Sequence, residues 1–103
     1  MVDRRRRVNW TENARTALSE ALDYIAQESP EGAIAVMEQA LSAARGLSVL
    51  SKRGRVVPEL SDPTIREIFV FNYRLLYEVS GDDINILAFL HGARDFAKWR
   101  GQE

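Results

Sequence analysis

Basic and aromatic residues in the second half of the chain are the groups whose types and spacing could do chemistry. Arg66, Arg74, His91 and Arg94 fall on consecutive stretches that read as strands, or just beyond the ends of those strands. Because alternate side chains of neighbouring strands point to one face, these residues could converge on an anion. Arginines placed there would stabilise the developing charge of a phosphodiester, and His91 or Tyr77 could transfer a proton.

Each of these residues also has a structural interpretation that needs no ligand. Arg74 can form an ion pair across a hairpin with either Glu67 or Glu78. His91 can be a strand-end histidine that hydrogen-bonds a backbone carbonyl. Arg94-Asp95 can form a local salt bridge where the strand stops. The residue types alone therefore leave both interpretations open.

The charge of the chain is nearly balanced but unevenly distributed. The formal net charge is −1, and twelve of the fourteen cations are arginine, which favours bidentate contacts with anions. Residues 11–50 carry two arginines against six acids, so the basic groups lie towards the two ends of the sequence. Any basic surface must be local. The run Arg4 to Arg7 could be a nucleic-acid arm, but a solvated edge strand protected by charge is the preferred interpretation.

Several classes of site are not indicated by the sequence. The chain has no cysteine and one histidine, so neither a disulfide nor a recognisable metal site is expected. The six glycines are scattered and form no phosphate-binding loop. No cofactor is therefore expected. The N-terminus lacks the apolar segment of a signal peptide, and no run is long enough to span a membrane, which fits a cytoplasmic protein.

The elements that must position the candidate residues begin with two helices. Thr11 can cap a helix that runs to about Glu28 with an apolar face at three-and-four spacing. Ser29-Pro30 then starts a second helix, with Ser29 as N-cap and Pro30 at the first helical position. Its predicted apolar face is Ile34, Met37, Leu41, Ala44 and Leu47 or Ser48. The two helices should form an antiparallel hairpin, packed closely through alanines at 33, 40, 43 and 44.

From Ser51 the periodicity changes to that of strands. Stretches at 54–57, 65–71, 74–79 and 84–90 are rich in β-branched and aromatic residues, and residues 4–9 can add a strand by tertiary pairing. Asn72-Tyr73 can make a tight hairpin turn, and 84–90 reads as a central strand. At 103 residues the chain is expected to be one domain, 1–103. The predicted fold is α+β, in the order β-α-α-β-β-β, with an antiparallel sheet, a helical hairpin on one face and room for a short helix over 93–100.

The strand region carries motifs that resemble the RelE/ParE superfamily of type II toxins. They are Gly54–Leu60, Ile65–Ile68, Tyr73–Val79, Ile86–Leu87 and His91–Asp95, and the likeness covers nearly the whole chain. This resemblance implies a small bacterial toxin that is neutralised by an antitoxin in a hetero-oligomer. It also implies one of two targets. RelE-like members cut mRNA on the ribosome with a set of basic residues, whereas ParE-like members lack that set and poison DNA gyrase.

Compared with the nucleases, the chain matches the superfamily pattern only in part. Arg74 matches an arginine that the nucleases place on this strand, and Arg66 stands where they often have a basic residue. His91 matches a late histidine of some nucleolytic relatives, although their neighbouring tyrosine is Gly92 here. Ile68 stands where a second lysine is expected in the nucleases. In place of a C-terminal tyrosine the chain has Phe96 or Trp99.

These departures favour a ParE-like gyrase inhibitor, of the kind that stabilises plasmids, over a ribosome-dependent mRNA endonuclease. In the nuclease alternative, Arg74, His91 and Arg94 would be catalytic. In either case Arg55, Arg66, Arg74 and Arg94 are candidate contacts to the target or the antitoxin. A groove between the helical hairpin and the sheet is expected to accept the antitoxin. A homologue that only binds an antitoxin is a third alternative.

Overall fold

The computed structural model describes residues 5–101, which form three helices and five strands. The helices are α1 (Glu12–Ala26), α2 (Pro30–Gly46) and α3 (Gly92–Arg100), and the strands are β1 (Arg7–Trp10), β2 (Arg55–Val56), β3 (Ile65–Val70), β4 (Tyr73–Ser80) and β5 (Asp83–His91). The α+β class, the helical hairpin and the short C-terminal helix are as predicted. Arg4 of the N-terminal arginine run lies outside the described residues.

Both predicted helix caps are present. The Thr11 hydroxyl accepts a hydrogen bond from the Ala14 amide at 3.2 Å, and the Ser29 hydroxyl accepts one from the Gly32 amide at 2.9 Å. Each bond satisfies one of the free amides in a first helical turn. Pro30 occupies the start of α2, where a missing amide hydrogen costs nothing. The starts of both helices are therefore set by their N-cap residues, Thr11 and Ser29.

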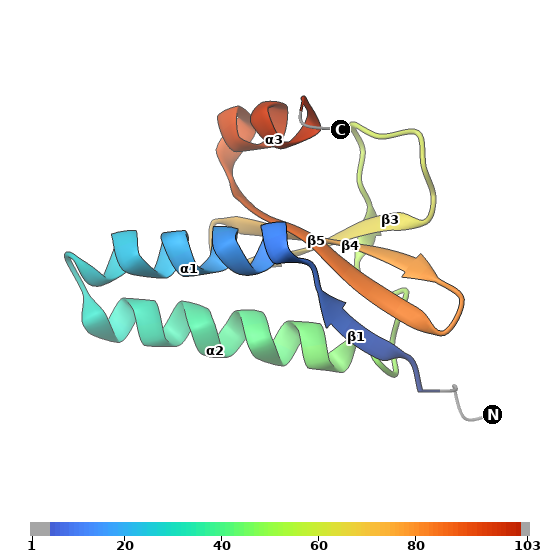
Figure 1. The fold of residues 1–103 in the computed structure, drawn as a ribbon, viewed down its shortest axis with the longest axis horizontal. Coiled ribbons are helices and arrows are strands. Elements are labelled where there is room, and N and C mark those ends of the chain that lie inside the picture. Colours follow the sequence, from blue (N-terminus) through green and yellow to red (C-terminus); the bar gives the residue numbers. More distant parts are fainter. Residues whose placement is uncertain (1–4, 102–103) are drawn as a thin grey trace.

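The strands form one sheet in the order β1-β5-β4-β3-β2 (Figure 1). The β2-β3, β3-β4 and β4-β5 pairs are antiparallel, whereas β1 pairs parallel with β5, so the sheet is mixed rather than wholly antiparallel. No tight turn joins β1 to its neighbour, so a hairpin does not fix its direction. β5 lies between two strands and is apolar on both faces, as predicted for a central strand. A two-residue strand, β2, forms the edge opposite β1.

Helices cover both faces of the sheet (Figure 1). The α1-α2 hairpin buries the larger core against one face, where Leu75, Tyr77 and Ile86 are fully buried. On the other face a smaller core contains Leu76 and Phe96, with α3 and the segment after β2 packed over it. The buried residues of β4 and β5 therefore face either the hairpin or α3.

Two details of the sequence prediction are wrong. On α2 the buried residues are Val36, Ala40, Ala43 and Ala44, whereas the predicted Ile34 and Met37 are exposed. The helix is rotated so that small residues, rather than the longest apolar ones, meet α1. The β3-β4 turn also lies one residue earlier than predicted. Its left-handed residue is Phe71, with φ of 54°, not Asn72.

Among the described residues no helix is both long and apolar enough to cross a membrane.

Candidate functional site

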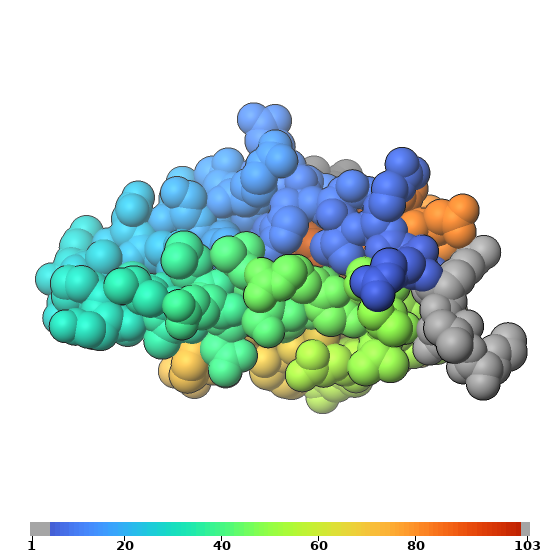
Figure 2. Space-filling view, turned by 90° about the horizontal axis from the view of Figure 1, so that it is seen from below, coloured from blue at the N-terminus to red at the C-terminus, as the bar shows by residue number. Residues whose placement is uncertain are grey.

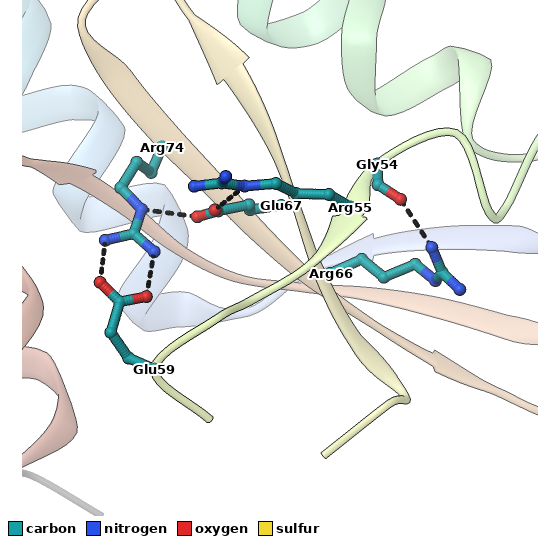
Figure 3. Close-up of polar contacts among 6 residues, drawn as sticks. All are labelled: Gly54, Arg55, Glu59, Arg66, Glu67 and Arg74. Carbon is teal, nitrogen blue, oxygen red and sulfur yellow. Dashed lines mark hydrogen bonds and ion pairs between the residues drawn. The ribbon is translucent and has the colours of Figure 1, made fainter. Parts of the chain in front are cut away.

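Arg74 lies at the centre of an ion-pair network on the α3 face of the sheet (Figure 3). Its guanidinium donates two hydrogen bonds to Glu59, at 2.8 and 3.0 Å, and one to Glu67 at 2.5 Å. Glu67 is fully buried and also accepts a 2.6 Å bond from Arg55. The Arg74 guanidinium lies 4.8 Å from the ring centroid of Phe96. Arg74 therefore has two carboxylates and an aromatic face as partners.

The network shifts the pKa values of Glu59 and Arg74. The bidentate hydrogen bond from Arg74 lowers the pKa of Glu59 below its ordinary value. In return, the hydrogen bond to Glu59, followed by the bond to Glu67, raises the pKa of Arg74. Both side chains are therefore charged at neutral pH. The predicted pairing of Arg74 with Glu67 is present, whereas the alternative partner, Glu78, is not in the network.

The strand register explains this pairing. Arg74 stands opposite Phe69, and Glu67 stands opposite Leu76, so the arginine and the acid are diagonal neighbours on one face of the β3-β4 hairpin. Glu59 reaches Arg74 from the segment after β2.

Arg66 points to the other face of β3 and supports a backbone turn. Its guanidinium donates a 2.7 Å hydrogen bond to the carbonyl of Gly54 (Figure 3). The same turn is held by the buried Tyr77, whose hydroxyl donates to the Ser51 carbonyl at 2.8 Å and accepts from the Gly54 amide at 2.9 Å. Burial raises the pKa of Tyr77, so its hydroxyl stays protonated. Tyr77 thus positions a loop and is not free for proton transfer.

A groove of about 760 Å³ lies between α1 and α3, along the end of β5. Its walls carry opposite net charge. Glu12 and Glu20 line it from α1, whereas α3 contributes two cations, Arg94 and Lys98, and one acid, Asp95. Aromatic residues also line it, namely Tyr24, Tyr73, Phe89 and Trp99. This shape and charge suit an extended or helical peptide segment.

His91 and Arg94 both line this groove. His91 is exposed, and its ring lies 4.8 Å from the ring of Tyr73. Tyr73 also stacks on Phe89 at 4.7 Å, and burial followed by the charge of Asp95 raises its pKa. Within residues 5–101, the predicted Arg94-Asp95 salt bridge does not form. Asp95 instead accepts a hydrogen bond from the His91 amide at the start of α3.

The structure therefore does not bring all three predicted nuclease residues together. His91 and Arg94 line the groove between α1 and α3, whereas Arg74 does not line it and points to the opposite face of the sheet from His91. The cause is a bulge in β5. Leu76 pairs with Ala88 and Tyr77 pairs with Ile86, so Leu87 is an extra residue that reverses the alternation beyond it. Without this bulge His91 would point to the same face as Arg74.

Sequence reasoning missed three features of these sites. The joint pairing of Arg74 with Glu59 and Glu67 was not predicted. The position of Glu67 could have indicated its part, because it lies on the same strand face as Phe69, the residue opposite Arg74. The bulge at Leu87 had no signal, since 84–90 is apolar throughout. The loop contacts of Tyr77 join residues far apart in the sequence. Within residues 5–101, no group of three histidine, aspartate or glutamate side chains could hold a metal ion.

Comparisons with known proteins agree with this fold. Residues 8–96 match the family model described as the ParE toxin of the type II toxin-antitoxin system, parDE. No curated protein matches the chain. Among solved structures, one described as the chromosomal ParDE toxin-antitoxin system from P. aeruginosa aligns with a TM-score of 0.69 and 21% identity, covering 85% of this chain and 97% of the other.

A second solved structure, the toxin-antitoxin complex RelBE2 from Mycobacterium tuberculosis, aligns with a TM-score of 0.56 and 24% identity. It covers 87% of this chain and 94% of the other. At these identities the two structures establish the shared fold alone. The family model spans most of the chain, including both helices of the hairpin, strands β2 to β5 and most of β1, and the protein therefore belongs to the ParE toxin family of type II toxin-antitoxin systems.

Proposed function

We propose that this toxin acts as a ParE-like poison of DNA gyrase in the bacterial cytoplasm, without chemistry of its own, and that a cognate antitoxin neutralises it. The observation that carries the proposal is the state of Arg74. The charge of this arginine is already balanced by two carboxylates, Glu59 and Glu67. A phosphodiester would have to displace a bidentate partner to reach it. We therefore infer that Arg74 stabilises the fold and does not bind a phosphodiester.

The separation of the other basic groups supports the same proposal. General acid-base catalysis needs the proton donor and the charge-stabilising group within reach of one reacting atom. His91 and Arg74 point to opposite faces of the sheet. Binding to a protein target makes no such demand. The family membership makes gyrase the first target to test.

A gyrase supercoiling assay with purified protein tests the proposal directly. We expect inhibition of supercoiling and accumulation of cleaved DNA as toxin is added. His91→Ala should keep this activity once its folding has been verified, because under this proposal His91 takes part in no reaction. No inhibition and no cleaved DNA at excess toxin would reject gyrase as the target.

The runner-up function is a ribosome-dependent mRNA endonuclease. One observation favours it: His91 and Arg94 line the same groove, beside the hydroxyl-bearing Tyr73. In that case His91 would transfer the proton, and Arg94 would stabilise the phosphate. Primer extension on a reporter mRNA after toxin induction separates the two functions. Cleavage that His91→Ala abolishes would establish the nuclease, and an intact mRNA would exclude it.

We further propose that the antitoxin occupies the groove between α1 and α3. The aromatic lining would take its apolar side chains, and the α3 wall, with Arg94 and Lys98, would take its acids. This location refines the expected groove between the hairpin and the sheet. The hairpin packs directly on the sheet in the main core, so no groove is open between them. The groove that is open lies along the side of α1 that faces α3.

A further inference from the structure

A second charged surface lies near the start of β1, apart from the groove between α1 and α3. Residues 4–11 and 39–58 contain no acid, and they carry most of the arginines and one of the lysines. The structure joins these two segments. The amide of Arg6 donates to the Ser48 carbonyl at 2.8 Å, and its guanidinium donates to the Ser51 hydroxyl at 3.2 Å. Figure 2 shows the dark-blue start of β1 against the lime-green segment that follows α2.

The loop at 50–54 is held rigidly at this surface. The buried Tyr77 hydroxyl bonds both to Ser51 and to Gly54, and Arg66 bonds the Gly54 carbonyl. Gly54 is also required by packing, because a Cβ there would lie 2.4 Å from the Glu67 carbonyl oxygen. Two exposed cations, Lys52 and Arg53, are therefore presented by a fixed backbone. A fixed loop loses little conformational entropy when it binds.

These residues line a groove of about 560 Å³, formed by Arg6, Leu50, Ser51, Lys52 and Arg53. Three of the five are cations, and none is an acid. Lys52 and Arg53 make no side-chain hydrogen bond or ion pair with any residue that the structure describes. The neighbouring turn contains two acids, Asp82 and Asp83, but neither lines the groove, and Asp83 is paired with Arg7 at 3.0 Å. The lining of the groove therefore carries a net positive charge.

We propose that this basic groove binds the phosphodiester backbone of a nucleic acid. Arginine, lysine and serine side chains are the usual phosphate contacts, and such contacts need no base recognition. A protein partner is less well served, because the anchors of protein interfaces are enriched in tryptophan and tyrosine as well as arginine, and no aromatic residue lines the groove. The inference goes beyond the proposed function, since that function assigns the toxin a protein target and no contact with nucleic acid.

The test measures binding of the whole protein to a short labelled DNA duplex, and to single-stranded RNA of equal length, over a series of salt concentrations. Three phosphate contacts predict a slope of log K against log salt of about −3 on the duplex. The variant Lys52→Ala/Arg53→Ala should reduce the magnitude of that slope by about 2 and weaken binding. The two nucleic acids show whether the groove prefers DNA or RNA, and binding to either supports the proposal.

A matched control removes two cations elsewhere. Arg15→Ala/Arg100→Ala changes the net charge by the same amount at exposed positions outside both grooves. It should leave the slope unchanged. If both double variants lose binding equally, the effect is one of net charge, and the proposal fails. Thermal unfolding verifies that each variant is folded. If Arg53→Ala disturbs α2, Lys52→Ala alone replaces the double variant and should change the slope by about 1.

Two further results would overturn the proposal. The first is no binding of either nucleic acid at low salt. The second is binding of a labelled polyglutamate peptide, sensitive to Lys52→Ala/Arg53→Ala, without binding of nucleic acid, which would assign the groove to an acidic protein. Because no gyrase is present in this assay, failure here leaves the gyrase result untouched, and failure in the gyrase assay leaves this result untouched.

Discussion

Glu67 is a buried carboxylate that serves two arginines, one nearly buried and one half exposed. Its side chain has no exposed surface, whereas 13% of Arg74 and 56% of Arg55 remain exposed. An ion removed from water at this position is tolerated only while its partners stay in place. Arg74, a candidate phosphate-binding residue in the sequence, thus neutralises a buried carboxylate of the sheet.

Glu67→Gln should therefore destabilise the protein strongly. The substitution keeps the size of the side chain but leaves Arg74 with Glu59 alone, so we expect a loss of about 3 kcal/mol in the free energy of unfolding. The matched control is Glu59→Gln, which removes the partly exposed acid from the same arginine and should cost at most about 1 kcal/mol. Urea unfolding measures both. Equal losses would show that burial of Glu67 does not matter.

Glu59 also predicts a pH dependence of stability. Arg74 lowers its pKa in the folded state, so the folded protein binds this proton less readily than the unfolded chain. The pair therefore stabilises the fold above the ordinary pKa of 4.5, and this contribution disappears as the pH falls through the lowered pKa. The difference in urea unfolding between wild type and Glu59→Gln should shrink in acid. A difference that is constant with pH would contradict this explanation.

At the scale of the elements, the positions of the helices and strands follow from local sequence. Which side of each element is buried does not. The caps at Thr11 and Ser29, and the central position of β5, could be predicted from residue types and spacing. The burial of α2 could be predicted in part, since Ala40, Ala43 and Ala44 pack closely as expected, whereas the exposure of the apolar residues Ile34 and Met37 could not. The bulge at Leu87 was also unpredictable, since it depends on pairing with β4. These tertiary effects decided which candidate residues meet.

Close packing of the hairpin gives a test at this scale. Ala40 is fully buried in the main core, whereas Ala35 is exposed on the same helix. Ala40→Leu must force its added carbons into a packed interface and should cost about 1–3 kcal/mol, while Ala35→Leu should be nearly neutral. Thermal or urea unfolding compares the two. A neutral Ala40→Leu would mean that α1 and α2 pack loosely there.

Across the whole molecule, a net charge of −1 conceals two surfaces of different character. One is the basic groove at 50–53, and the other is the groove with opposed walls between α1 and α3. Composition could show that any basic surface must be local. It could not place that surface, because Arg6 and Arg53 meet only through tertiary contacts. Separate surfaces of this kind would let one small toxin meet partners of different chemistry.

The last turn of α3 allows a sharp test of the antitoxin site. Lys98 lines the groove between α1 and α3, whereas Arg100, two residues later and also exposed, does not. If the antitoxin places acids against the α3 wall, Lys98→Glu should weaken its binding roughly tenfold, or by about 1.4 kcal/mol, through like-charge contact. Arg100→Glu makes the same change in net charge and should have little effect. Titration calorimetry with the antitoxin encoded beside the toxin measures both affinities, and the loss should diminish at high salt because exposed charges are screened. Equal effects of the two substitutions would show that net charge, rather than the groove, governs binding.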